Sequence, residues 1–301
     1  MSSIGVLLVT YNQYDITKKF ILNYIQCFPL EKYKLLILDN NSSDMTFEKI
    51  KEEFPEIDIR KLNGNYGCVT GRNIGIVELI KLESNYIFIS DNDIVFKDSE
   101  TLNKLGKFMQ SHPELAGCCP IVRWFDDESI QTLGTREVRK NWFKNVSVLD
   151  NNIFVNSLPG CAQFVKSSTF KKYGVYDNDL SPISIEDLEW GMRATKNGAK
   201  LAYVNDCEVY HIQKRNVKNS REKTEHVIKG RGVFLRKYFS LQSIAREFRN
   251  FIYFTYNYGF IFTIRAYKKG LTKKIEKDNY NFDKFKETIS KYVTDIYFTH
   301  I

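Results

Sequence analysis

The stretch Tyr86-Ile87-Phe88-Ile89-Ser90-Asp91-Asn92-Asp93 decides how the rest of the chain is interpreted. It begins with continuous aromatic and β-branched residues, which are typical of a strand buried on both faces of a sheet. Two carboxylates follow the strand with one residue between them, and both can reach one hard cation. The alternative is a simple turn, because Asp and Asn favour turns and a D-x-D triplet alone is a weak signal.

Three earlier apolar runs also end in polar residues, and they alternate with segments whose apolar residues recur at helical spacing. The runs cover residues 4–10, 33–38 and 57–62, and the helical segments cover residues 14–27, 45–54 and about 70–82. Strands that alternate with helices predict an α/β fold with a doubly wound, mostly parallel sheet, which binds ligands at the carboxyl ends of its strands. The polar residues expected at that edge are Thr10, Tyr11, Asn12, Asp39, residues 63–67 and residues 91–93.

Local signals sharpen two of these segments. Ser42 or Ser43 is predicted to cap the second helix, and Pro55 to end it. The first strand-to-helix turn, residues 10–13, contains no glycine, which argues against a dinucleotide-binding oxidoreductase.

Glycines follow the third strand instead, at intervals of four residues. Gly67, Gly71 and Gly75 flank Arg72, and glycines one helical turn apart let a helix lie close to another backbone. Arg72 could meet a phosphate or a carboxylate near the start of that helix. The alternative is a tightly packed helix in which Arg72 forms a structural ion pair.

The second half of the chain carries acid at a predicted helix start. Residues 185–198 form this helix, with Leu188, Met192 and Thr195 on its core face and Gly198 at its end. Glu186 and Asp187 would stand at its first turn, where a carboxylate could accept a proton. Short strands are expected at residues 201–204 and 208–210, and His211 follows the second one as a candidate metal ligand.

Composition limits the class of protein. The chain has 301 residues, 43% of them hydrophobic, and a net charge of +8, so it can bury a large core and attract polyanions. No nucleic-acid-binding motif accompanies that charge. The six cysteines lack C-x-x-C spacing and no signal peptide opens the chain, which predicts a cytoplasmic protein with free thiols.

The order of these motifs resembles one family. The chain contains V-T-Y-N, L-D-N-N-S-S-D, N-x-N-Y-G-x-x-x-G-R-N-x-G, the D-x-D strand, E-D-x-E-W-x-x-R-x-x-x-x-G and V-Y-H, in this order over roughly residues 4–212. This pattern is similar to that of family 2 glycosyltransferases with the GT-A fold. The resemblance implies an enzyme that moves a sugar from a nucleotide diphosphate, most often UDP, with inversion at the anomeric carbon.

The resemblance also assigns roles to residues. It implies Asp187 as the catalytic base, supported by Glu186, and a Mn²⁺ or Mg²⁺ site formed by Asp93, Asp91 and His211. Asp39 would accept a hydrogen bond from the uracil ring. The expected nucleotide-binding residues are Thr10, Tyr11, Asn12, Asp39, Asn65, Gly67, Arg72, Asp91 and Asn92.

Physical chemistry agrees with this assignment. A metal that bridges the two phosphates stabilises the leaving group, and inversion needs a single base for the acceptor hydroxyl. The acceptor would be a glycan or lipid-linked sugar, as in bacterial surface polysaccharide synthesis, with a protein acceptor as the alternative. A nucleotidyltransferase would need a Gly-rich basic loop after the first strand, which is missing. A non-catalytic scaffold that binds nucleotide sugars stays open, because fold does not imply activity.

We expect a GT-A domain over residues 1–212, with a nucleotide half at about 1–95 and an acceptor half at about 96–212, and a separate helical region over residues 213–301. Residues 125–152, a polar stretch of short strands and loops, and the helical tail are the expected sources of acceptor contacts. The aromatic run at 251–262 is too short and too polar to span a bilayer, which needs about 20 apolar residues. Basic residues surround it, so the region is predicted to contact the inner face of a membrane or to form a homodimer. The basic residues before the run are Lys214, Arg215, Lys218, Arg221, Lys223, Lys229, Arg231, Arg236 and Lys237.

Overall fold

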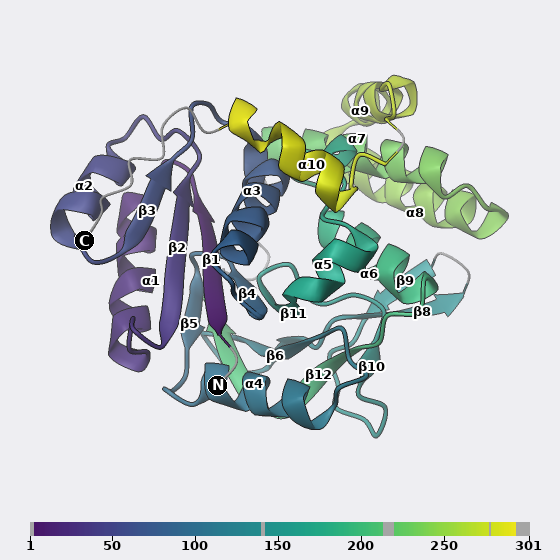
Figure 1. Ribbon diagram of the computed structural model, residues 1–301. Helices are drawn as coiled ribbons and strands as arrows, with labels where there is room; N and C mark the ends of the chain where they lie inside the picture. The colour runs from purple at the N-terminus through teal and green to yellow at the C-terminus, as the bar shows by residue number, and fades with distance from the viewer. Residues whose placement is uncertain (1–2, 140–141, 213–219, 277, 293–301) are drawn as a thin grey trace.

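The computed structural model describes residues 3–139, 142–212, 220–276 and 278–292. The first half follows the predicted alternation of strands and helices (Figure 1). Its strands are β1 (Ile4–Thr10), β2 (Tyr33–Asp39), β3 (Asp58–Lys61) and β4 (Tyr86–Ser90), joined by α1 (Tyr14–Cys27), α2 (Thr46–Glu53) and α3 (Gly67–Lys81). The strands pair in parallel in the order β3-β2-β1-β4, so their carboxyl ends meet at one edge.

The second half makes the sheet mixed. β11 (Ala162–Lys166) runs antiparallel between β4 and β6 (Gly117–Trp124), and β12 (Leu201–His211) runs parallel to β6. The two short strands predicted at 201–204 and 208–210 are therefore one strand, with a register shift between Val204 and Glu208. A bulge interrupts the apolar pattern without ending the strand, which explains the wrong prediction.

Shorter elements complete this half. They are β5 (Ile94–Phe96), α4 (Thr101–Ser111), β7 (Ile130–Thr132), β8 (Thr135–Arg139), β9 (Trp142–Asn145), β10 (Phe154–Val155), α5 (Ser167–Tyr173), the 3-10 helix η1 (Asn178–Leu180) and α6 (Glu186–Lys196). β8 and β9 form a separate hairpin within the predicted region of short strands, residues 125–152.

The sheet separates two layers of buried apolar residues. On one face, residues such as Phe20 of α1 and Leu105 of α4 pack with Val6 and Phe88. On the other face, α3, α5 and α6 bury residues such as Trp190. Both faces of β4 are covered, as its unbroken apolar run predicts.

Three local predictions need correction. The N-cap of α2 is Met45, and neither Ser42 nor Ser43 caps it; the Asp44 carboxylate accepts the Thr46 N–H instead. α3 begins at Gly67, three residues earlier than predicted, because its first residues pack against the loop before α6. α6 buries Met192 as predicted, but Trp190 dominates its core face and Leu188 and Thr195 are only half-buried.

The glycines of α3 allow the close helix packing that their spacing predicts. A Cβ on Gly75 would lie 2.1 Å from Leu7 Cδ1, and one on Gly71 would lie 2.9 Å from Val9 Cγ1. α3 therefore lies directly against β1. Arg72 lies between these two glycines in α3 and reaches Asp91, directly after β4.

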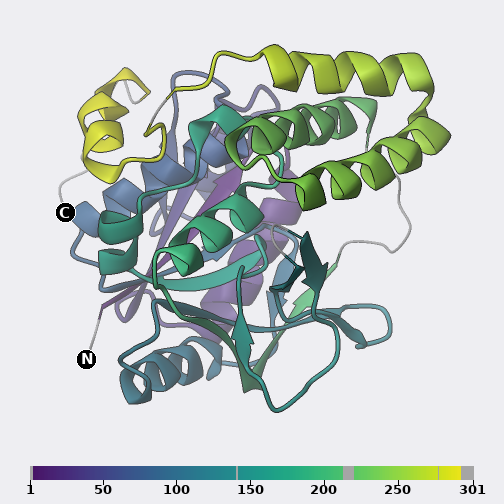
Figure 2. The same ribbon diagram turned by 90° about the vertical axis from the view of Figure 1, so that its right-hand side faces the viewer.

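Among the described residues that follow the sheet, the α-helices are α7 (Arg221–Lys237), α8 (Leu241–Tyr258), α9 (Phe260–Thr272) and α10 (Phe282–Thr288), and the 3-10 helix η2 (Ile289–Lys291) continues α10. α8 and α9 project from the rest of the molecule, whereas α10 returns to it (Figures 1 and 2). Tyr292, just after η2, packs its ring on Tyr66, so the helical region is not detached over its whole length. The division at residue 212 remains a prediction. Within the described ranges, no helix has the length and apolarity needed to cross a membrane.

A buried ion-pair network joins three of these elements. The Arg72 guanidinium is 2.6 Å from the Asp91 carboxylate after β4 and 3.1 Å from the Glu186 carboxylate at the start of α6. Arg72 and Glu186 are both almost fully buried, whereas the Asp91 side chain is 40% exposed. This is the structural ion pair that the sequence left open as one of two roles for Arg72.

Replacing Arg72 tests how much this network stabilises the fold. Arg72→Met should lower the free energy of unfolding by about 3 kcal/mol or more, because it leaves the buried Glu186 carboxylate without its cation. Urea denaturation followed by circular dichroism measures the change. Arg60→Met is the matched control: Arg60 pairs with the exposed Asp58 and with Glu78, which keeps Lys81, so a loss of about 1 kcal/mol is expected. Equal losses in the two variants would contradict a special role for Arg72.

Candidate active site

Asp93 and His211 form a pair at the carboxyl edge of the sheet. After Asp93 the chain enters β5, which pairs antiparallel with the end of β12 and places Ile94 opposite His211. His211 Nε2 lies 3.0 Å from Asp93 Oδ2, and His211 Nδ1 lies 2.9 Å from Gln131 Oε1. When Nδ1 donates to the Gln131 amide oxygen, Nε2 faces the Asp93 carboxylate, so that Nε2 and the carboxylate could both coordinate one cation.

The second oxygen of Asp93 supports a cation at this pair. Asp93 Oδ1 is buried and has no hydrogen-bond partner, an arrangement that a bound ion would relieve. In the described part of the chain, no group of three or more His, Cys, Asp or Glu side chains could hold a metal ion. Mg²⁺ and Mn²⁺ sites commonly use one or two protein ligands together with substrate phosphates and water. The Asp93 and His211 pair fits that kind of site.

The side chains of Asp91 and Asn92 have partners outside the Asp93 and His211 pair, and the predicted role of Asp91 as a metal ligand stays a prediction. Asp91 Oδ1 accepts from Arg72, and the Asp91 backbone N–H donates to the Cys161 carbonyl. The Asn92 side chain is buried and donates to Gln13 and Thr17 of α1. Asn92 thus anchors the triplet to the first helix, and its predicted contact with a nucleotide gains no support from the geometry.

Glu186 and Asp187 have different surroundings although they are neighbours. Glu186 is occupied by Arg72 and by the Ser184 backbone N–H. Asp187 is half-buried and accepts the Gly160 and Leu188 N–H groups. Burial and then the charge of Glu186 raise the pKa of Asp187 to about 6. A carboxylate with a pKa near neutrality is suited to accept a proton at physiological pH.

The turn before β11 connects the two acidic groups. Gly160 reaches Asp187, and the next residue, Cys161, reaches Asp91 through its carbonyl. A Cβ on Gly160 would lie 3.1 Å from Asp187 Oδ2, so glycine permits this close approach. Burial raises the pKa of the Cys161 thiol, and the charges of Asp91, Asp93 and Asp187 raise it further. The acids therefore gather around one turn.

A second cluster lies at the ends of β1 and β2, where Thr10 pairs with Asp39. Asp39 is fully buried; its Oδ1 accepts the Ser42 N–H at 2.7 Å, and its Oδ2 is buried without a partner. Burial raises the pKa of Asp39. Thr10 is also buried, and its hydroxyl bonds to Thr17. The unpartnered oxygen of Asp39 can accept one further hydrogen bond.

Asn12 and Tyr11 follow β1 and differ in exposure. Asn12 has a φ of 52°; its N–H donates to Ser42 Oγ and its side-chain oxygen accepts the Ser43 N–H. Asn12 therefore holds the loops after β1 and β2 together. Tyr11 is 42% exposed beside them, which leaves its ring accessible to a ligand.

Asn65 and Gly67 shape the loop that leads into α3. Asn65 Oδ1 accepts the Gly67 N–H, and Gly67 has a φ of 80°. A Cβ on Gly67 would lie 2.3 Å from Pro182, so this glycine serves packing against the loop before α6. Like Arg72 and Asn92, both residues are engaged within the protein. Their predicted nucleotide contacts remain untested.

Three residues of the site were missed by sequence reasoning. Gln131 orients His211, Gly160 donates to Asp187, and Asn40 accepts the Tyr66 N–H above the end of β2. Only Asn40, directly after Asp39 at a strand end, carried a signal that could have identified it. Gln131 and Gly160 are brought in by strand pairings between distant segments.

Comparisons with known proteins agree with this architecture. A curated protein from Methanococcus voltae, dolichyl N-acetyl-alpha-D-glucosaminyl phosphate 3-beta-D-2,3-diacetamido-2,3-dideoxy-beta-D-glucuronosyltransferase, is 23% identical over 265 residues, which cover 80% of this chain and 77% of that protein. The structure of GalNAc-T7 with UDP, GalNAc and Mn²⁺ matches with a TM-score of 0.62 at 14% identity, over 97% of this chain and 58% of that chain. The chain thus spans little more than half of that structure.

The structure of S. aureus TarS 1-349 with UDP-GlcNAc matches with a TM-score of 0.55 at 14% identity, over 96% of this chain and 90% of that chain. These likenesses confirm the predicted GT-A fold, with its mostly parallel sheet and C-terminal helices. The family model described as Glycosyl transferase family 2 matches residues 5–170, which is more than half of the chain. The chain therefore belongs to glycosyl transferase family 2 and is a glycosyltransferase.

Proposed function

We propose that this chain transfers a sugar from a nucleotide diphosphate to a hydroxyl group of a glycan or lipid-linked acceptor, with inversion at the anomeric carbon. One observation carries the proposal: the turn at Gly160 and Cys161 bonds both to Asp187, whose pKa is about 6, and to Asp91, two residues before the Asp93 of the Asp93 and His211 pair. An acceptor base and a diphosphate site are the two parts that inverting transfer needs.

The donor half of the proposal rests on Asp39 and on the Asp93 and His211 pair. The buried, unpartnered Asp39 Oδ2 suits the imide N–H of uracil, which favours a UDP-sugar. Asp93 and His211 would hold Mn²⁺ or Mg²⁺, which supplies Lewis-acid stabilisation of the departing diphosphate. The likeness to structures that contain UDP, UDP-GlcNAc or Mn²⁺ supports this choice of donor and metal.

The acceptor half rests on Asp187. Its carboxylate takes the proton of the attacking hydroxyl, and the Gly160 and Leu188 N–H groups hold it in place. Glu186 pairs with Arg72, and its charge beside Asp187 raises the pKa of Asp187, which makes Asp187 more basic. A lipid-linked acceptor is favoured because the similar protein from Methanococcus voltae is named for a dolichyl-linked one.

A nucleotide panel tests the donor assignment. We expect UDP to raise the melting temperature more than CDP, because cytosine presents an acceptor at the position where uracil carries the imide N–H. Asp39→Asn keeps an oxygen for the Ser42 N–H and offers an amide N–H in place of Oδ2, so it should weaken UDP binding roughly tenfold. Titration calorimetry of UDP measures this. Unchanged UDP affinity would assign Asp39 to loop capping alone.

Removal of the pair tests the metal assignment. Asp93→Ala should abolish the part of UDP binding that depends on Mn²⁺, and His211→Ala should reduce it less, since water can replace one ligand. Calorimetry of UDP with and without Mn²⁺ gives the readout without turnover. Glu208→Ala is the control, because Glu208 shares β12 with His211 but pairs with Lys97 and Arg123. A Mn²⁺ effect that survives in Asp93→Ala would refute the site.

The base is tested by its pH dependence. Asp187→Asn should bind UDP as well as the wild type and transfer sugar about a hundredfold more slowly or worse. In the wild type, kcat/KM should fall about tenfold per pH unit below a pH of about 6, because the base must be deprotonated. Glu186→Gln should move this fall to lower pH, since it removes a charge that raises the pKa of Asp187. Wild-type transfer by Asp187→Asn together with an inactive Glu186→Gln would give the role of base to Glu186.

A further inference from the structure

α8 is amphipathic with its faces reversed. Its large apolar side chains face solvent at helical spacing, and they are Leu241, Ile244, Phe248, Ile252 and Tyr256, with Tyr256 90% exposed. Its fully buried side chains are the polar Ser243, Arg246 and Glu247. Phe251 and Phe254 are half-buried against the cluster formed by Ile228, Ala266 and Tyr267. A helix on the surface of a soluble protein ordinarily shows the opposite arrangement. More than half of the large apolar side chains exposed in the described ranges lie between residues 239 and 271.

A polar network fixes this orientation of α8. Glu247 accepts from the Tyr267 hydroxyl of α9 at 2.8 Å and pairs with Arg246, and Arg231 of α7 lies 3.4 Å away. Turning the apolar side of α8 inwards would break these buried bonds. The exposed apolar stripe is therefore built into the fold.

α9 repeats the pattern. It buries the small or polar side of the helix, including Thr263, Ala266 and Gly270, and exposes Phe260, Ile261, Ile264 and Leu271. A Cβ on Gly270 would lie 2.0 Å from the Lys229 carbonyl oxygen of α7, so α7 and α9 pack closely. We call the exposed apolar residues of both helices the α8–α9 face.

The charges around the α8–α9 face are mostly positive, and Glu225 of α7, which also lines this surface, pairs with Lys269. Residues 239–275 contain seven Lys or Arg and one acid, Glu247, which is buried. Arg249, Arg265, Lys268 and Lys274 are exposed. A hollow of about 930 Å³ between α7 and α9 is lined by Arg221, Arg265 and Lys268 together with Phe260 and Ile261. Cations and apolar rings thus share one surface.

We propose that the α8–α9 face docks on an anionic lipid bilayer. Its apolar side chains would enter the boundary between headgroups and acyl chains, and Arg265, Lys268 and their neighbours would meet the lipid phosphates. A second copy of the chain is disfavoured as the occupant, because a symmetric contact would bring two mainly cationic surfaces together, and Glu225, the acid beside the hollow, already pairs with Lys269. Of the basic residues named from the sequence, Lys214, Arg215 and Lys218 lie outside the described residues.

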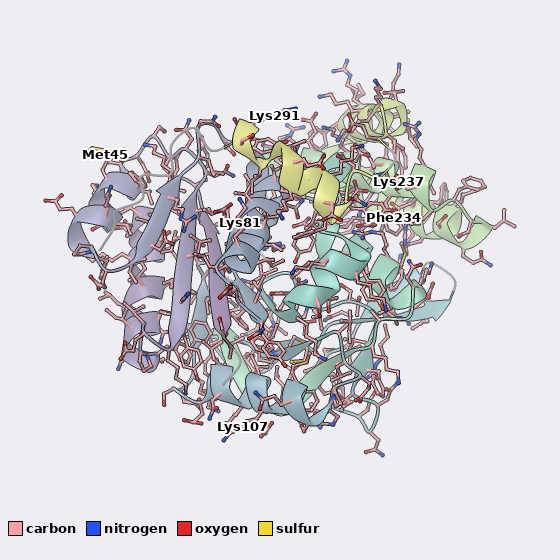
Figure 3. The ribbon with its side chains drawn as sticks, viewed as in Figure 1. Met45, Lys81, Lys107, Phe234, Lys237 and Lys291 are labelled. Carbon is pink, nitrogen blue, oxygen red and sulfur yellow. The ribbon has the colours of Figure 1, made fainter. Side chains whose placement is uncertain are left out.

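Docking would also orient the catalytic edge. Gly230 of α7 packs against Ser184, just before α6, and Phe234 packs with Ile185 and Met192. Lys237 pairs with Asp177 and Asp179. Figure 3 labels Phe234 and Lys237 on this helix. The helix that carries Asp187 is therefore held beside the docked unit, which suits a lipid-linked acceptor; this consequence rests on the proposed function, and the docking itself does not.

Vesicle flotation tests the docking with the full chain. We expect the protein to float with vesicles of phosphatidylcholine and phosphatidylglycerol, and not with phosphatidylcholine alone or in high salt. Phe248→Glu and the double variant Arg265→Glu with Lys268→Glu should each weaken binding roughly tenfold or more. Leu22→Glu on α1 and Lys107→Glu on α4 are matched controls on other surfaces, and Figure 3 shows Lys107 far from α7. Both controls should bind as the wild type does.

Several results would overturn the proposal. They are a wild type that does not float with anionic vesicles, flotation that ignores lipid charge, and controls that lose binding as much as the α8–α9 variants. Light scattering tests the alternative occupant, a second copy of the chain. If the wild type is a dimer that does not float, and Phe248→Glu is a monomer, the α8–α9 face is assigned to a contact between two copies. Circular dichroism confirms that each variant is folded, and the charge-reversal pair gives an independent result if Phe248→Glu is not. Flotation is measured without a nucleotide-sugar donor, so it is independent of the proposed function. If the wild type did not bind UDP, the proposed function would be refuted, but a positive flotation result would still support docking on lipid.

Discussion

The candidate active site depends on one buried cation, the guanidinium of Arg72. Three carboxylates, Asp91, Glu186 and Asp187, gather around Arg72, and without it their mutual repulsion would oppose the packing of α3 on α6. Arg72 bonds directly to the first two and acts on the third only through its field, where burial and Glu186 outweigh it. Because the guanidinium is committed to Glu186, Asp187 keeps a pKa near neutrality. The ion pair therefore stabilises the fold and, under the proposed function, also helps to set the basicity of Asp187.

The sequence predicted the elements whose information is local. β1, β2 and β4 are uninterrupted apolar runs, and the glycine spacing of α3 reflects contact with β1. The cap of α2 was wrong because Asp44 competes with two nearby serines for the same role, and a pattern of residue types cannot rank them. His211 could be proposed from its place after a strand. Its pairing with Asp93 could not, because it depends on β5, three residues without a distinctive pattern.

Motif residues proved to be of two kinds. Asp39 and Asp93 each keep a buried oxygen without a partner, so their side chains are unsatisfied within the protein. Other motif residues use their side chains for hydrogen bonds within the protein: Asn12 and Asn65 bond to loop residues, and Asn92 bonds to the start of α1. A sequence motif does not distinguish the two kinds, because a structural role and a ligand-binding role can require the same type of residue. The two kinds are separated by whether the buried polar atoms of the side chain have hydrogen-bond partners within the protein. A residue whose atoms are all paired holds the loops, whereas one with an unpaired buried oxygen can still bind a ligand.

In the helical region, the sequence pattern predicts a helix but not which of its sides faces solvent. An amphipathic period in α8 is visible from the chain, but the period does not say which side is covered. The buried bonds of Glu247 decide it, since a carboxylate paired with Arg246 and Tyr267 must face α9 and turns the apolar stripe outwards. α7 then links that stripe to the catalytic edge through Gly230, Phe234 and Lys237. Through these contacts, α7 fixes the orientation of the α8–α9 face, the proposed lipid-docking surface, relative to Asp187.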